Sequence, residues 1–226
     1  MQGLTAHTSA GRKYLSIKKG MFFYKCEETG HEAFQEKVSE FQGTEYISRG
    51  LWFSKLEDTI TKVELYDGTF GMQIMITTSL GYVIQIRWDS RYGVHLMEKI
   101  VNDKLDLSKP ITLQPYDFEN EGKKIQGLNI IQDGEKINSA YFDIETKKEA
   151  DGFPKVPEAK NGKKITSIMW KNYFSARNGH LMELFDEWLD NQSFSAETKA
   201  SASGDSLKSA DVEQLNSAEG VEDLPF

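Results

Sequence analysis

Basic and aromatic side chains lie beside one another in several short segments of this chain. Between Arg49 and Lys55, two basic residues flank Trp52 and Phe53. A planar ring can stack on a nucleobase and a lysine or arginine can hold a phosphate, so such segments have the chemistry to bind an unpaired nucleic-acid strand. A ring at these positions can equally fill a hydrophobic core. The candidate contact residues are Arg49, Trp52, Phe53, Lys55, Lys62, Tyr66, Arg87, Trp88 and Tyr116.

Residues for catalysis are scarcer. The only cysteine is Cys26 and the four histidines are far apart in the sequence, so neither a cysteine zinc site nor a Cys–His nucleophile pair is expected. The segment Phe142-Asp143-Ile144-Glu145-Thr146 resembles the first acidic motif of proofreading 3′–5′ exonucleases, in which an Asp and a Glu two positions apart on a strand share two metal ions. The further aspartate motifs of that family are missing. The sequence therefore predicts no catalytic residue, metal site or cofactor, with a metal-dependent exonuclease as an alternative function.

The end of the chain differs from the rest in charge and composition. Residues 194–226 contain seven acidic and two basic residues, a net charge of −5 within the total of −8. From Ser195 to Gly220 there is no aromatic residue, so this segment cannot bury enough apolar surface to offset its chain entropy. We predict a folded domain over residues 1–193 and a disordered acidic tail over residues 194–226. Its tip is predicted to bind partner proteins through Asp223, Leu224, Pro225 and Phe226.

The last five residues, Glu222-Asp223-Leu224-Pro225-Phe226, resemble the acidic tip of bacterial single-stranded DNA-binding proteins, which end in Asp-Ile-Pro-Phe or a near variant. Phage-encoded single-stranded DNA-binding proteins also commonly end in an acidic tail with a terminal Phe. Bacterial members have a shorter body and a Gly/Gln/Pro-rich linker, neither of which is present here, so the resemblance favours a phage-type protein.

This resemblance implies sequence-tolerant, non-enzymatic binding of single-stranded DNA in DNA replication, recombination and repair. It also implies an acidic tail that competes with DNA for the binding groove and recruits a polymerase, helicase or nuclease. A replisome adaptor that carries such a tail without DNA affinity is a further alternative to the exonuclease.

The middle of the chain has the pattern of a strand-rich domain with one internal helix. Polar and apolar residues alternate in short runs separated by turn dipeptides such as Asp67-Gly68. Apolar residues recur at helical spacing over residues 91–104. The predicted order is three meandering strands, a helix and two strands. This is the order of the five-stranded Greek-key OB-fold barrel, although other small barrels give a similar pattern. The predicted strands cover residues 59–66, 70–78, 82–88, 111–116, 125–132 and 136–142.

Further elements flank this segment. Strands over 13–24 and 46–56 extend the sheet, residues 149–164 form a loop, and an amphipathic helix covers about 180–190. Residues 165–176 fit either a strand or a helix. The predicted fold is therefore mainly β with α: an OB-fold-like Greek-key barrel with extra strands, a C-terminal amphipathic helix and a disordered acidic tail.

Alternation along the strands predicts which candidate residues face away from the core. Lys62 and Tyr66 share the outer side of their strand, and Arg87 and Tyr116 lie opposite apolar neighbours. Lysine pairs near predicted turns, such as Lys18-Lys19, can guide a phosphate backbone along the rim of a barrel.

The composition does not point to a membrane. No apolar run approaches the ~18 residues of a spanning helix, and the first residues lack the basic and apolar regions of a signal peptide. With 38% hydrophobic residues, the chain has enough apolar material for a core. We expect a cytoplasmic protein, in the bacterial host cell if it is phage-encoded.

Overall fold

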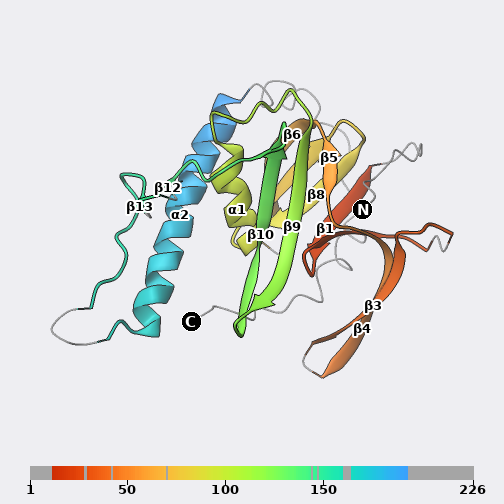
Figure 1. Cartoon of the computed structure of the whole chain (residues 1–226), viewed down its shortest axis with the longest axis horizontal. Helices are drawn as coiled ribbons and strands as arrows, with labels where there is room; N and C mark the ends of the chain where they lie inside the picture. The colour runs from red at the N-terminus through yellow and green to blue at the C-terminus, as the bar shows by residue number, and fades with distance from the viewer. Residues whose placement is uncertain are drawn as a thin grey trace.

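The computed structural model describes residues 12–27, 30–41, 43–69, 71–143, 145–146, 148–159 and 164–192. This part of the chain is mainly β and contains two α-helices, α1 (Arg91–Ile100) and α2 (Ser167–Asn191) (Figure 1). One sheet has seven strands: β1 (Lys13–Lys18), β2 (Met21–Lys25), β3 (Phe34–Phe41), β4 (Thr44–Phe53), β6 (Ile60–Gly68), β7 (Gly71–Thr78) and β8 (Tyr82–Arg87). A second sheet has four strands: β5 (Leu56–Asp58), β9 (Ile111–Asn120), β10 (Lys123–Gln132) and β11 (Glu135–Lys136). The short strands β12 (Phe142–Asp143) and β13 (Lys148–Glu149) pair with each other.

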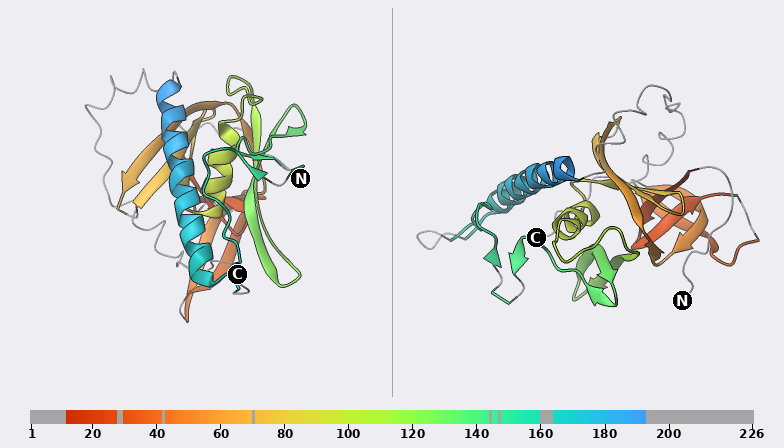
Figure 2. Two further views of the ribbon diagram at one scale, coloured as in Figure 1. Left: turned by 90° about the vertical axis from the view of Figure 1, so that its left-hand side faces the viewer. Right: turned by 90° about the horizontal axis from the view of Figure 1, so that it is seen from above.

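The seven-stranded sheet has the order β3-β4-β2-β1-β8-β7-β6, and it is antiparallel except that β1 runs parallel to β8. β4 and β6 lie five positions apart in this order, yet only residues 54–59 separate them in the chain. Five strand spacings in a flat sheet come to about 24 Å, which the chain from Phe53 to Ile60 could cover only when fully extended. This connection is not straight, because β5 leaves it to pair with β9. The sheet is therefore strongly curved (Figure 2).

The predicted order of three strands, a helix and two strands is present as β6, β7, β8, α1, β9 and β10. The two sheets do not close into one barrel, because β9 and β10 belong to the sheet that contains β5 and β11. β1, which the sequence predicts only as an extension of the sheet, instead lies between β2 and β8. Alternation predicts that a strand exists but not which distant strand it joins.

Two predicted strand boundaries are wrong for local reasons. The run 13–24 is a hairpin of two strands, because Lys19 and Gly20 adopt φ angles of 47° and 68° and reverse the chain between β1 and β2. Of the strand predicted over 136–142, only Lys136, at the end of β11, and Phe142, at the start of β12, lie in strands, and β11 pairs with only two residues of β10.

The helices also differ in length from the prediction. α1 ends at Ile100 instead of 104, with Val101 as its C-cap. Residues 165–176, which fit either a strand or a helix, join the predicted helix to form the 25 residues of α2. Thr166 begins this helix, because its Oγ1 accepts a hydrogen bond from the backbone N–H of Met169 at 3.3 Å. Within the described ranges, neither helix is long and apolar enough to span a membrane.

One hydrophobic cluster joins the curved sheet, the hairpin β9–β10 and both helices. From the sheet it contains residues such as Phe22 and Ile84, and from α1 it contains Leu96, each 0% exposed. From α2 it contains Leu181 and Phe185, also 0% exposed. Only the second half of α2 thus supplies fully buried side chains.

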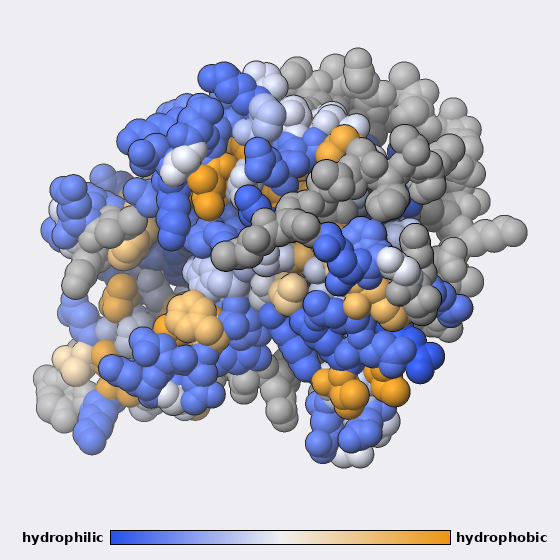
Figure 3. Space-filling model, turned by 45° about the vertical axis from the view of Figure 1, so that its right-hand side comes forward, coloured by the Kyte–Doolittle hydropathy of each residue, from blue (hydrophilic) through white to orange (hydrophobic). Residues whose placement is uncertain are grey.

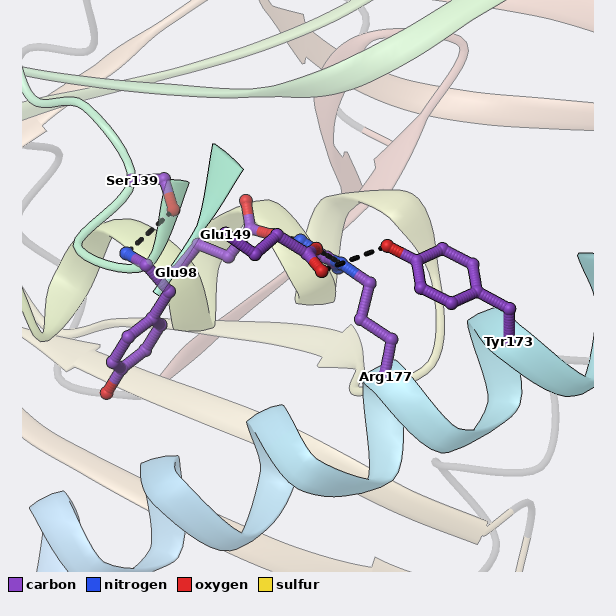
Figure 4. A network of polar contacts seen from close by, with 6 residues as sticks. Glu98, Ser139, Glu149, Tyr173 and Arg177 are labelled. Carbon is purple, nitrogen blue, oxygen red and sulfur yellow. Dashed lines mark hydrogen bonds and ion pairs between the residues drawn. The ribbon is translucent and has the colours of Figure 1, made fainter. Parts of the chain in front are cut away.

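A polar network holds α2 in place at its middle (Figure 4). The Arg177 guanidinium of α2 is ion-paired with Glu98 of α1 and with Glu149 of β13. The Tyr173 hydroxyl donates a hydrogen bond of 2.9 Å to Glu149. Burial and the adjacent Glu149 carboxylate raise the pKa of Tyr173 to about 12, so this hydroxyl keeps the proton it donates at neutral pH. The network contacts α2 at Tyr173 and Arg177, and residues 167–172 of the helix precede it.

Candidate nucleic-acid interface

Side chains on the seven-stranded sheet alternate between the core and the opposite side, which we call the outer sheet face. Strand register places one row of this face across six strands. A second, shorter row contains Tyr66, Gln73 and Arg87. Four predicted contact residues share this face. Trp52, Tyr66 and Arg87 lie in these rows, and Lys62 lies two positions before Glu64 on the same side of β6. The six-strand row consists of Glu64, Met75, Gln85, Ser16, Phe23 and Trp52.

Two aromatic rings lie at the β2–β4 end of the six-strand row. The ring centroids of Phe23 and Trp52 are 4.7 Å apart, and the indole N–H of Trp52 donates to the Gln35 carbonyl at 3.2 Å. These side chains are only 2% and 4% exposed. Lysine side chains lie over both rings, with Lys18 Nζ 4.9 Å from the Phe23 centroid and Lys37 Nζ 4.2 Å from the Trp52 centroid. A nucleobase can stack on either ring only after these lysines move.

Lys18, Lys19 and Lys37 form what we call the lysine cluster. Lys18 Nζ lies 3.5 Å from Ser48 Oγ, Lys19 Nζ donates to the Val38 carbonyl at 3.0 Å, and Lys37 Nζ donates to Met21 Sδ at 3.1 Å. Burial and the nearby charge of Lys19 lower the pKa of Lys37. A bound anion would oppose this shift, so the cluster favours a negatively charged ligand.

The hairpin β3–β4, which carries Lys37, projects from the body (Figure 1) and has two different sides. Lys37 and Ser48 pair on the side of the lysine cluster. On the other side Val38 pairs with Ile47, and these residues are 54% and 57% exposed. Figure 3 shows apolar surface among hydrophilic side chains at the lower edge of the molecule, where this hairpin projects. The cations and the exposed aliphatic residues of the hairpin are thus separated.

The β6–β8 part of the outer sheet face is built differently. Tyr66 is 39% exposed and is the most exposed of the five predicted stacking rings. The cations beside it are paired with carboxylates, Lys62 with Glu64 at 2.5 Å and Arg87 with Asp89 at 2.8 Å. Here a ring is accessible, but the neighbouring charge is largely neutralised.

The other predicted residues of the sheet region lie away from this face. The ring of Phe53 is 5% exposed and belongs to the core, which corrects its assignment as a stacking residue. Trp88 is half-buried and packs against the same core.

The two remaining cations of this region also lie away from the outer sheet face. Arg49 is ion-paired with Glu36 at 3.0 Å on the side of the hairpin that carries Val38 and Ile47. Lys55 lies half-buried in the connection after β4.

Gly50 of β4, beside Arg49, lies close to the backbone of β2. A Cβ at this position would lie 2.1 Å from the Tyr24 carbonyl oxygen of β2. The close packing of β4 against β2 therefore explains the glycine at this position.

Tyr116 lies on β9 of the second sheet, where it contacts a histidine and another ring. Its hydroxyl is 3.4 Å from His95 Nδ1, and its ring centroid is 5.9 Å from that of Phe118, which is 51% exposed. Burial, together with the charges of Lys99, Arg177 and Arg91, lowers the pKa of His95 to about 4, so this imidazole is neutral at neutral pH. The pair Tyr116 and Phe118 is a separate aromatic surface from the outer sheet face.

Sequence reasoning missed Phe23, Lys37 and Phe118. Phe118 follows Tyr116 by two positions, so strand alternation would have placed both on one side. Phe23 and Lys37 had no such signal, because their importance comes from the neighbours that β1 and β4 bring to them.

Of the two acids in the motif near residue 143, Asp143 ends a strand and Glu145 lies in the turn that follows. β12 ends at Asp143, whose Oδ1 accepts hydrogen bonds from the backbone N–H groups of Glu145 at 2.8 Å and Thr146 at 3.1 Å. The hydrogen bonds from Thr146 and Glu145 lower the pKa of Asp143. The carboxylate thus stabilises a turn, and in the described ranges no three metal-binding side chains gather at one place.

The predicted tail, with Asp223, Leu224, Pro225 and Phe226, lies outside the described residues. No protein-family model, curated protein or solved structure matches the chain.

Proposed function

We propose that this protein binds single-stranded DNA through the outer sheet face, without enzymatic action and with little sequence preference. The observation that carries the proposal is the lysine cluster over Phe23 and Trp52, which brings three cations and two aromatic rings to one place. Phosphates and bases are the two groups that such a combination recognises.

Binding at the lysine cluster follows from a competition between rings and phosphates for the same cations. A cation–π contact is worth about 0.5–2 kcal/mol, whereas a phosphate offers each ammonium a full negative charge and strong acceptor oxygens. As Lys18 and Lys37 turn towards phosphates, the faces of Phe23 and Trp52 become available to bases. Contacts of this kind do not read base edges, so they tolerate any sequence.

The β6–β8 part extends the same binding face. Tyr66 offers a ring that needs no rearrangement, and Lys62 and Arg87 can exchange their carboxylate partners for phosphates. The predicted OB-fold relationship belongs to this proposal, supported by the meander β6-β7-β8 followed by α1 and by the strong curvature of the sheet.

The phage-type tail resemblance adds a role for Asp223, Leu224, Pro225 and Phe226. We propose that this tip recruits replication proteins and that the acids of the tail compete with DNA for the lysine cluster. A tethered acidic segment is present at high effective concentration, so the competition should be strongest at low salt.

The test is a titration of the full chain with a fluorescently labelled 30-mer of dT at increasing salt, with duplex DNA as the control ligand. We expect preferential binding of the single strand that weakens steeply with salt, because lysines release condensed counterions from the phosphates. Absence of a complex at low salt overturns the proposal and favours the adaptor. Magnesium-dependent release of nucleotides from the 30-mer overturns the non-enzymatic part.

A further inference from the structure

The two halves of α2 differ in what they expose. In the first half, Ile168, Met169 and Phe174 are 68%, 39% and 38% exposed, and the rings of Trp170 and Phe174 stack with centroids 5.8 Å apart. The fully buried side chains of this helix all lie in its second half. The first half therefore exposes apolar side chains that the described part of the chain does not cover. At helical spacing Met169, Trp170 and Phe174 lie on one broad side of the helix, and Ile168 lies on another.

Charge is segregated along the same helix. From Lys164 to Asn178 there are three basic residues and no acidic one, and no acidic residue lies in the first turn. From Gly179 to Gln192 there are four acidic residues, and His180 is the only residue that can carry a positive charge. Arg177 is already held by Glu98 and Glu149, which leaves Lys164 and Lys171 as the exposed cations beside the apolar surface. The partner of this surface should therefore be both apolar and acidic.

The end of the chain has this composition. Residues 221–226 combine Val221, Leu224 and Phe226 with Glu222 and Asp223. The acidic second half of α2 repels such a segment, while the first half attracts it. The positive end of the helix dipole adds to this attraction near Thr166.

The connecting length also fits. From Asn191 back to Trp170, α2 rises about 32 Å at 1.5 Å per residue. About 30 residues lie between α2 and the tip. If they have the disorder that their composition predicts, a chain of that length has a root-mean-square reach of roughly 30 Å. The tip of the same molecule can therefore reach the first half of α2 without stretching its tether.

We propose that residues 221–226 dock on the first half of α2 of the same molecule, with Leu224 and Phe226 against Met169, Trp170 and Phe174. Glu222 and Asp223 then lie near Lys164 and Lys171. The proposal does not depend on DNA binding, and it makes α2 a competitor of any partner protein that binds the tip.

The four tryptophans provide the test, because they report on different places: Trp52 on the outer sheet face, Trp88 after β8, and Trp170 and Trp188 on the two halves of α2. The full chain is labelled with 5-fluorotryptophan, and each ¹⁹F resonance is assigned with single Trp→Phe variants. Spectra without DNA are compared for the unaltered chain, for Leu224→Ala/Phe226→Ala, and for the tail control Val212→Ala.

We expect the double substitution to move the Trp170 resonance while the other three stay in place, and Val212→Ala to move none. In a Lys171→Glu chain, adding Leu224→Ala/Phe226→Ala should move Trp170 less than it does in the unaltered chain, whereas in a Lys148→Glu chain, altered on β13, it should move Trp170 fully. The change should be independent of protein concentration, since the tip belongs to the same molecule.

Three results overturn the proposal: no movement of Trp170, movement of Trp52 instead, which places the tip on the outer sheet face, or a concentration-dependent change, which places it on another copy. A chain that fails to bind DNA but shows the Trp170 change would contradict the proposed function alone.

Discussion

The two ends of the outer sheet face combine rings and charges in opposite ways. Around β2 and β4, the rings of Phe23 and Trp52 are almost fully buried beneath lysines, and Lys19 and Lys37 of the lysine cluster donate to the Val38 carbonyl and Met21 Sδ. Around β6 and β8, Tyr66 is exposed, but Lys62 and Arg87 are paired with carboxylates. One end therefore combines clustered lysines with covered rings, and the other combines an exposed ring with cations that are paired with carboxylates. The first end should set the affinity for phosphates, and the second should accept a base at once.

The largest expected effect separates a core ring from a surface ring. Phe53→Ala removes a ring that is 5% exposed inside the core, so we expect a loss of about 3–5 kcal/mol in the free energy of unfolding. Urea denaturation followed by circular dichroism measures this loss. A variant with unchanged stability but weakened DNA binding would make Phe53 a DNA-binding residue after all.

Local sequence patterns predict much of the fold, but they do not predict which strands pair with each other. The strands β6, β7 and β8 and the start of α1 agree with alternation, turn dipeptides and helical spacing, since each depends on neighbouring residues. The position of β1 beside β8, and the separate sheet of β9 and β10, depend on contacts between distant segments. No alternation pattern contains that information.

For the candidate site too, local patterns predicted some features and could not predict others. Alternation correctly put Lys62, Tyr66 and Arg87 on the side of the sheet away from the core. It could not show that Phe53 and Trp52 are buried, because a strand covered on both sides carries apolar residues at successive positions.

The second effect tests the end that carries the lysine cluster. Lys19→Glu/Lys37→Glu replaces two cations of the lysine cluster with two anions, so we expect roughly hundredfold weaker binding of a dT 30-mer at low salt. The slope of log affinity against log salt should also become shallower, by about 0.7 for each phosphate that the variant no longer neutralises. Fluorescence anisotropy at several salt concentrations measures both quantities.

The matched control for that double variant is Lys123→Glu/Lys136→Glu, which changes two exposed lysines of β10 and β11. It alters the net charge of the chain equally but lies in the other sheet. Equal weakening by both double variants would show that total charge, and not the lysine cluster, determines the affinity.

The third effect tests the end with an available ring. Tyr66→Ala removes an exposed ring, so we expect a loss of about 1–3 kcal/mol in DNA binding, with little change in stability. Tyr66→Phe keeps the stacking face and should bind nearly as well as the unaltered chain. If Tyr66→Phe weakens binding as much as Tyr66→Ala, the hydroxyl and not the ring makes the contact.

The smallest effect tests whether carboxylates limit the β6–β8 end. Asp89 is paired with Arg87 at 2.8 Å, and both side chains are about two-fifths exposed, at 40% and 41%. A pair this accessible to water contributes only about 0.2–1 kcal/mol, so Asp89→Asn should barely change stability. The same substitution removes a negative charge beside the proposed DNA path and lets Arg87 meet a phosphate. We therefore expect DNA binding to tighten a few-fold at low salt, with the gain disappearing as salt screens the charges.

The gain should also require the cation, so Arg87→Ala/Asp89→Asn should bind no more tightly than Arg87→Ala. A gain of equal size in both backgrounds would mean that Asp89 repels DNA directly, and the ion pair would then have no part in the difference between the two ends.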